Sequence, residues 1–171
     1  NDGDYANIEI SFKLFYAFGM LLAGKVVDML GTKKGYALAT GLWSLSAIGH
    51  ALANSAGGFM IARAALGVTE AGNFPAAIKA TAEWFPKKER ALATGIFNSG
   101  TNIGAIVAPL TVPFMAKAWG WQTAFIITGL IGFIWLILWQ KYYTSPAENK
   151  KVSAEELNYI ESDKVDGVND S

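Results

Sequence analysis

Two charged side chains, Arg63 and Glu70, stand in a segment otherwise built mainly from small and apolar residues. At about 100° per residue, seven positions return a helix to nearly the same face, so both side chains point one way, about 10 Å apart along the axis. If this helix begins near Gly58 at a membrane face, Glu70 lies roughly 18 Å deep, near the middle of a ~30 Å hydrocarbon layer. Charges at that depth are costly and typical of functional sites. We therefore predict a binding or proton-carrying site here, with an ion pair that only fixes packing as the alternative.

A second group of residues, Gly24, Asp28, Gly31, Lys33 and Lys34, follows the first apolar segment. Gly24 and Asp28 are four residues apart and share one helix face, and Gly31 is suited to end the helix. From the residues alone, this pattern is equally typical of an ordinary helix end with solvated charges.

A third group combines two carboxamides with a ridge of small residues. Gly100, Gly104 and Ala108 are spaced to allow close contact with another helix. Asn98 and Asn102 lie on a neighbouring face, and a carboxamide in hydrocarbon needs a partner or water. We expect them either to bind another helix or to contact the hydroxyls of a sugar-like substrate.

Other polar residues predict local structure rather than chemistry. Lys79 and Glu83 are four residues apart and are expected to form a local pair, as are Glu9 and Lys13. His50 stands alone and is expected to be an interfacial or hydrogen-bonded residue. The chain has no cysteine, no nucleophile beside a base and no phosphate loop, so we predict neither an enzyme nor a cofactor nor a metal site.

The elements that position these residues are five long apolar segments. Apolar residues make up 52% of the chain and charged residues only 16%, which favours a membrane protein. The segments are 12–30, 36–53, 57–85, 91–118 and 121–143, each long enough to span a bilayer. The sequence therefore predicts an all-α, polytopic membrane helical bundle over 1–143, in contact with the lipid bilayer. Residues 144–171 are polar and predict a cytoplasmic segment with a short helix, because Ser153 and Glu156 resemble a capping box.

Basic residues in the connections set the orientation. Lys33, Lys34, Lys87, Lys88 and Arg90 fall on one side, which the positive-inside rule makes cytoplasmic. The N-terminus then lies outside and the tail inside. The polar start without Met and the odd number of spans lead us to expect a preceding helix. The formal net charge of zero argues against nucleic acid as a partner.

The motifs resemble those of a known family. Gly24, Asp28, Gly31, Lys33 and Lys34 have the spacing of the signature loop of the major facilitator superfamily, although Met29 stands where a basic residue is usual. The run from Arg63 through Glu70 and Pro75, followed by Trp84-Phe85-Pro86 and Glu89-Arg90, resembles the fourth helix and next loop of its anion:cation symporter family. The stretch from Trp121 to Phe125 and the tail around Tyr143 and Pro146 are similar to hexuronate transporters of that family.

This resemblance implies a fold and a function. The chain would supply the second to sixth helices of an N-terminal six-helix half, with the first helix and the C-terminal half as partners from the same protein. The protein would import a sugar-acid anion such as galacturonate or glucuronate by proton symport, in a bacterial inner membrane.

The resemblance also implies roles for single residues. Arg63 would bind the organic anion, Glu70 would carry the coupling proton, and Asn98 and Asn102 would contact substrate. Gly24, Asp28 and Gly31, with Lys33 and Lys34, would bias the conformational switch. Gluconate, galactonate or another organic acid, and sodium coupling, stay open as alternatives. So does a non-transport assembly or receptor subunit in which Arg63 and Glu70 only hold helices together.

Overall fold

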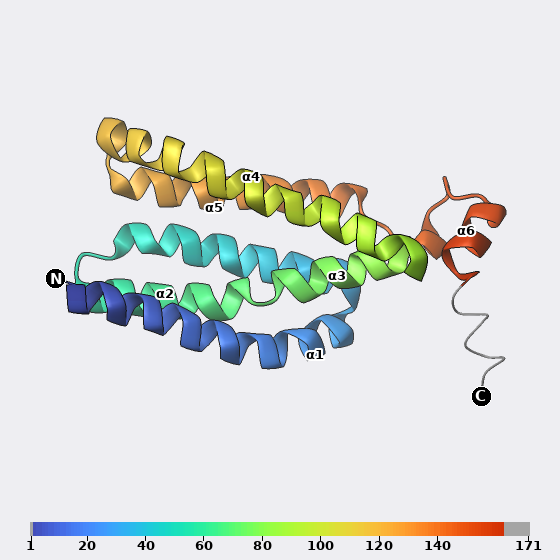
Figure 1. The fold of residues 1–171 in the computed structure, drawn as a ribbon, viewed down its shortest axis with the longest axis horizontal. Helices are drawn as coiled ribbons and strands as arrows, with labels where there is room; N and C mark the ends of the chain where they lie inside the picture. The colour runs from blue at the N-terminus through green and yellow to red at the C-terminus, as the bar shows by residue number, and fades with distance from the viewer. Residues whose placement is uncertain (1, 163–171) are drawn as a thin grey trace.

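Long antiparallel helices form the molecule (Figure 1). The computed structural model describes residues 2–162, and all regular structure in that part of the chain is helical. The long helices are α1 (Asp2–Gly49), α2 (Ala56–Glu70), α3 (Asn73–Trp84), α4 (Lys87–Trp119) and α5 (Trp121–Tyr142), and the short ones are η1 (His50–Leu52), η2 (Pro146–Glu148) and α6 (Ala154–Ile160). The all-α bundle expected from the sequence is confirmed.

Two glycines reverse the chain without a loop. Gly31 divides α1 into two antiparallel halves, and Gly120 joins α4 to α5 (Figure 1). Their φ angles are 75° and 88°, a region that glycine enters without the penalty of a Cβ atom. The predicted apolar segments leave five residues, 31–35, between the first two and two residues, 119–120, between the last two. One residue suffices at each place because glycine alone supplies the turn.

The apolar segment 57–85 is a broken helix. α2 ends at Glu70 and α3 begins at Asn73, and the two continue in roughly one direction (Figure 1). Pro75 has no backbone donor for the carbonyl of Ala71, so the helical ladder is interrupted there. The break therefore falls directly beside the half-buried side chain of Glu70.

Three helices are long and apolar enough to cross a membrane in the described residues, namely α1, α4 and α5. Because α1 folds back at Gly31, it supplies two crossings, and α2 with α3 runs alongside them. The chain is thus a multi-pass integral membrane protein.

Small residues bring the helix backbones into contact. A Cβ atom added to Gly67 of α2 would lie 2.5 Å from the carbonyl oxygen of Phe12 in α1, and one added to Gly129 of α5 would lie 2.6 Å from the carbonyl oxygen of Ser44. Such close approach is how helices associate in lipid, where burying apolar surface gives little driving force.

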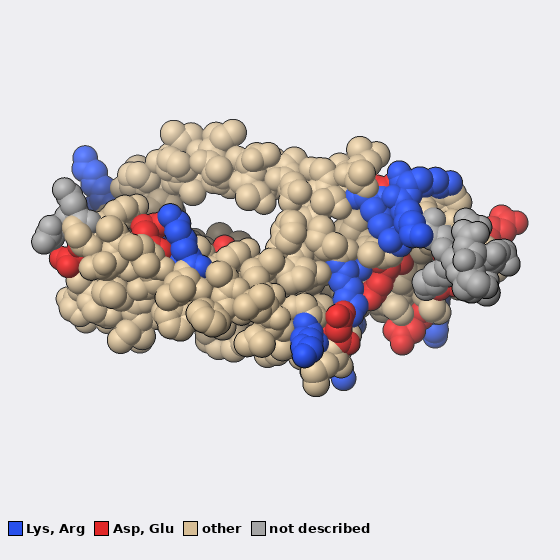
Figure 2. Space-filling model, turned by 60° about the horizontal axis from the view of Figure 1, so that its bottom comes forward, with Lys and Arg blue, Asp and Glu red and all other residues tan. Residues whose placement is uncertain are grey.

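By contrast, α4 stands away from its neighbours at mid-length. Figure 2 shows the molecule hollowed through at its middle, with charged groups gathered mainly toward one end. Among the described residues, nothing lies within 4 Å of a Cβ atom added to Gly100 or Gly104. The close contact expected of this ridge is therefore not made within the described part of the chain.

The short helix α6 docks on the junction between α3 and α4. Its first turn is capped by Ser153 Oγ, which accepts a hydrogen bond from the amide of Glu156 at 3.1 Å. The hydroxyl of Tyr159 donates to the carboxylate of Glu89, and Lys88 Nζ lies 4.4 Å from the centre of the Tyr159 ring. These contacts hold the tail against the basic end of the bundle.

Gly67→Ala is expected to destabilise the purified protein in detergent. The added methyl group would overlap the backbone of α1, and overpacking of this kind costs about 1–3 kcal/mol. Thermal unfolding followed by tryptophan fluorescence should show a lower midpoint. Gly57→Ala is the matched control, because a Cβ atom there meets nothing within 4 Å. Equal midpoints for both variants would contradict the predicted α1–α2 contact.

Candidate functional site

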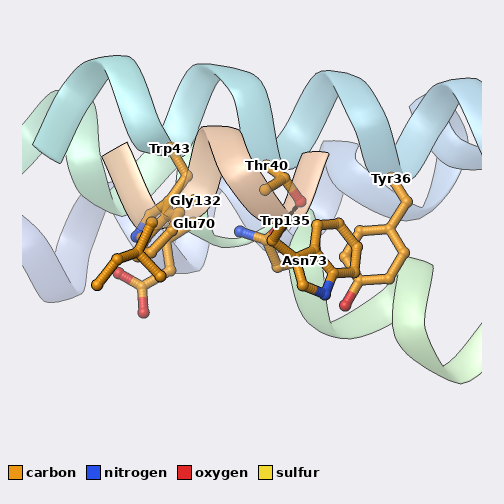
Figure 3. Close-up of a pocket in the computed structure, with 8 residues that line it drawn as sticks. Tyr36, Thr40, Trp43, Glu70, Asn73, Gly132 and Trp135 are labelled. Carbon is orange, nitrogen blue, oxygen red and sulfur yellow. Dashed lines mark hydrogen bonds between the residues drawn. The ribbon is translucent and has the colours of Figure 1, made fainter. Parts of the chain in front are cut away.

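A cavity of about 380 Å³ lies where α1, α5 and the broken α2–α3 helix meet. Its walls carry three aromatic side chains and three polar ones, together with Ile131 and Gly132 of α5 (Figure 3). These six are Tyr36, Thr40, Trp43, Glu70, Asn73 and Trp135. Glu70 supplies the carboxyl group of this lining, at the last residue of α2.

Two further polar residues of the cavity wall, Thr40 and Asn73, are hydrogen-bonded to each other. The hydroxyl of Thr40 donates to Asn73 Oδ1 at 2.9 Å, which ties α1 to the first residue of α3. Neither residue was among the sequence-predicted site residues. One sequence signal could have predicted this polar face of α1. Thr32, Tyr36 and Thr40 follow one another at intervals of four, and such residues share one side of a helix.

Arg63 lies two helical turns before Glu70 on α2 and is half-buried. Its charge acts on the carboxyl of Glu70, yet in the part of the chain that the structure describes the two form no ion pair within 4 Å. Arg63 does not line the cavity. The guanidinium is therefore not neutralised by a direct contact with Glu70.

The two predicted asparagines lie on α4, away from this cavity. Asn98 is half-buried, Asn102 is exposed, and neither lines the cavity that contains Glu70. Within the described residues, the structure does not gather Arg63, Glu70 and the two asparagines around one pocket.

The glycine and lysine motif surrounds the kink of α1. Asp28 Oδ1 lies 2.6 Å from Lys79 Nζ of α3, and the same nitrogen lies 3.4 Å from the carbonyl oxygen of Val27. The carbonyl of Lys33 accepts a hydrogen bond from Trp139 Nε1 at 3.0 Å, whereas Lys34 is exposed. A Cβ atom added to Gly24 would meet nothing within 4 Å.

The local Lys79–Glu83 pair expected from the sequence is wrong. Lys79 pairs with Asp28 instead, and Glu83 accepts hydrogen bonds from the hydroxyls of Thr32 and Tyr143. The reason is the fold, since the kink at Gly31 brings the end of the first half of α1 and the start of the second against α3. Burial, and then the carboxylate of Glu83, raise the pKa of Tyr143 well above its usual range, so this hydroxyl keeps its proton and donates.

His50 is fully buried at the far end of the bundle from this motif. Its Nδ1 lies 2.8 Å from the carbonyl oxygen of Ser46, and its ring stacks on Phe125 at 4.8 Å. The sequence predicted an interfacial or hydrogen-bonded histidine, and the structure gives the hydrogen-bonded form.

Comparison with known proteins matches residues 7–163 to the Major Facilitator Superfamily. The chain is 46% identical over 156 residues to a galacturonate transporter of Dickeya chrysanthemi, which covers 91% of this chain and 45% of the relative. It is 44% identical over 156 residues to a hexuronate transporter of Escherichia coli K12, covering 91% and 36%. A D-galactonate transporter of Escherichia coli O6:H1 is 33% identical over 151 residues, covering 88% and 35%. The chain thus spans less than half the length of these relatives.

A double-mutant cycle on Asp28 and Lys79 should reveal a coupling of about 0.5–1 kcal/mol, a modest value because the aspartate side chain is 73% exposed. We expect Asp28→Asn and Lys79→Met to destabilise the protein less in combination than the sum of the single changes. Thermal unfolding in detergent measures this coupling. The exposed pair Glu9 and Lys13, 3.7 Å apart on one helix, is the control and should couple by less. Strict additivity at Asp28 and Lys79 would contradict a stabilising pair.

Proposed function

The chain belongs to the Major Facilitator Superfamily, and from this membership we propose that its protein imports a sugar-acid anion by proton symport. The observation that carries the proposal is the relation of Arg63 to Glu70. Both lie on a helix among membrane-spanning neighbours, yet no salt bridge joins them in the described residues. A cation in such a place is suited to an anionic ligand.

Arg63 is proposed to bind the carboxylate of the substrate. A guanidinium offers two parallel N–H donors that match the two oxygens of a carboxylate. In a site of low dielectric constant, this charge-assisted contact is stronger than in water. Asn98 and Asn102 of α4 are proposed to contact the hydroxyl groups of the same substrate.

The substrate class follows from the names of the relatives. The three quoted above are named as transporters of galacturonate, hexuronate and D-galactonate, which are all sugar acids. A hexuronate is the proposed substrate, since the two relatives with the higher identities carry names of that class.

Glu70 is proposed to carry the coupling proton. Its carboxyl lines a mostly apolar cavity beside the break in the α2–α3 helix, where a change of charge alters the energy of the surrounding fold strongly. Coupling arises if the protein changes conformation easily only when proton and substrate are both bound or both absent. Transporters of this type alternate access by rocking two halves around a central site, and this chain supplies part of one half.

The kink of α1 is proposed to bias this conformational switch on the cytoplasmic side. Gly31 supplies the turn, the Asp28–Lys79 pair joins the half of α1 before it to α3, and the Thr32–Glu83 hydrogen bond joins the half after it. The basic residues at this end, Lys33 and Lys34 among them, support a cytoplasmic orientation in a bacterial inner membrane.

Arg63→Lys is expected to weaken uptake more than the retained charge suggests. Lysine offers one flexible point charge in place of a planar, bidentate fork. The full-length protein in proteoliposomes, supplied with radiolabelled galacturonate, should show a raised apparent KM. An unchanged rate and affinity would contradict the carboxylate-binding role and favour a packing role for Arg63.

Glu70→Gln separates coupling from folding. Glutamine keeps the shape of the protonated acid but cannot release a proton, so the variant should still exchange labelled for unlabelled substrate. It should not accumulate substrate when a pH gradient is imposed. Both activities are measured on one preparation of the full-length protein.

The opposite results each exclude part of the proposal. If exchange and accumulation fall together in Glu70→Gln, the carboxyl has a structural role. Intact accumulation driven by the pH gradient would eliminate Glu70 as the proton carrier.

A further inference from the structure

A line of polar side chains runs along one face of α1 from the cavity toward the cytoplasmic end. Thr32, Tyr36, Thr40 and Ser44 are spaced four residues apart, so they stand above one another over roughly 18 Å. Three of these residues, Thr32, Thr40 and Ser44, are exposed by 5% or less. Polar groups buried in an apolar bundle cost free energy unless they are hydrogen-bonded, so such a line indicates a shared role.

The line has a carboxyl group near each end. At mid-membrane depth, Glu70 lines the cavity together with Tyr36 and Thr40. At the cytoplasmic end, Glu83 accepts hydrogen bonds from Thr32 and Tyr143. The two glutamates are 13 residues apart along the α2–α3 axis, about 20 Å. That distance is too long for direct proton transfer between them.

From this arrangement, we propose that Glu83 is a second proton-accepting group, and that a proton released by Glu70 reaches it through the cavity and the hydroxyl of Tyr36. This inference deepens the proposed proton symport and rests on it. It concerns the route of the proton to the cytoplasm, which neither the family match nor the names of the relatives describe.

The cavity has the size and chemistry for the first part of the route. Its volume of about 380 Å³ exceeds by several-fold the ~30 Å³ that a water molecule occupies in the liquid. Glu70, Asn73, Thr40 and Tyr36 supply the polar partners that such waters need. Because Thr40 uses its proton on Asn73 Oδ1, the Asn73 amide nitrogen is left to hold a water beside Glu70.

Tyr36 is positioned for the second part of the proton route, from the cavity to Glu83. It lies one helical turn from Thr32, about 5.4 Å along the axis, and Thr32 donates to Glu83. Its ring packs against Trp135 and Trp139, each with a ring centre 4.8 Å away. A tyrosine hydroxyl both donates and accepts, so it can take up a proton from water on one side while giving its own to the other.

The step balances without a further reactant. The O–H bond of protonated Glu70 breaks, each hydrogen-bonded group on the route accepts one proton and gives one, and an O–H bond forms on Glu83. Other charged or titratable groups that act on the two carboxyls are Arg63 and Tyr16 near Glu70, and Tyr143 at Glu83.

Tyr36→Phe tests the route in the full-length protein, because it removes one oxygen and keeps the ring that packs against Trp135 and Trp139. In proteoliposomes, we expect accumulation of labelled galacturonate driven by a pH gradient to slow about tenfold or more. Exchange of labelled for unlabelled substrate should stay at the wild-type rate, since exchange requires no proton release. Glu83→Gln should show the same split. Tyr142→Phe is the matched control, because Tyr142 is 69% exposed and lies outside the cavity.

The possible outcomes are distinct. If the wild-type protein fails to accumulate substrate under a pH gradient, the proposed symport is wrong and the route fails with it. If the wild-type protein accumulates substrate and both Tyr36→Phe and Glu83→Gln match Tyr142→Phe, only the route is wrong. Loss of exchange together with accumulation in Tyr36→Phe would show that the hydroxyl is structural, which also overturns the route.

Discussion

The missing backbone donor of Pro75 is the constraint on which the candidate site depends. In hydrocarbon, each backbone group must find a partner inside the protein, and Pro75 leaves the carbonyl of Ala71 without its helical donor. The helix ends at Glu70 and restarts at Asn73. This interruption sets a carboxyl and a carboxamide at the two edges of a helix break, and both line the same cavity. In an unbroken helix, the backbone hydrogen bonds would run on past Glu70 without this gap.

The break is tolerated because the surrounding helices lie very close. Glycines of α1 and α2 allow the backbones on either side to touch, as at Gly19, where an added Cβ atom would lie 2.7 Å from Ala71 Cβ. Gly72, inside the break, would meet Ala39 of α1 at 2.8 Å. Dispersion contacts between such closely packed helices supply much of the association energy in lipid.

Much of the fold could be predicted from local sequence. The length of an apolar segment predicts a helix, and a glycine predicts a turn, without knowledge of the rest of the chain. The capped start of α6 at Ser153 is such a local signal. The partners of Lys79 and Glu83 could not be predicted in this way, since each binds a residue about 50 or more positions distant in sequence. A spacing of four residues favours a helical pair, but the kink at Gly31 offers both residues partners from other helices. The cavity was missed for the same reason. Thr40 and Asn73 meet only after two helices fold together.

The charged residues at one end of the broken α2–α3 helix have direct partners, whereas those near its middle do not pair with each other in the described part of the chain. At the end that carries the basic residues, Asp28, Lys79 and Glu83 all have direct partners drawn from separate elements. At mid-depth, Arg63 and Glu70 act on one another without contact within 4 Å in the described residues. Moving α3 away from α1 at this end would break the Asp28–Lys79 pair and the Thr32–Glu83 hydrogen bond. The end with the basic residues is therefore tied to α1 by side-chain contacts. At the middle of the helix, no ion pair within the described residues joins Arg63 to Glu70, so the charge of either can change there without breaking such a pair.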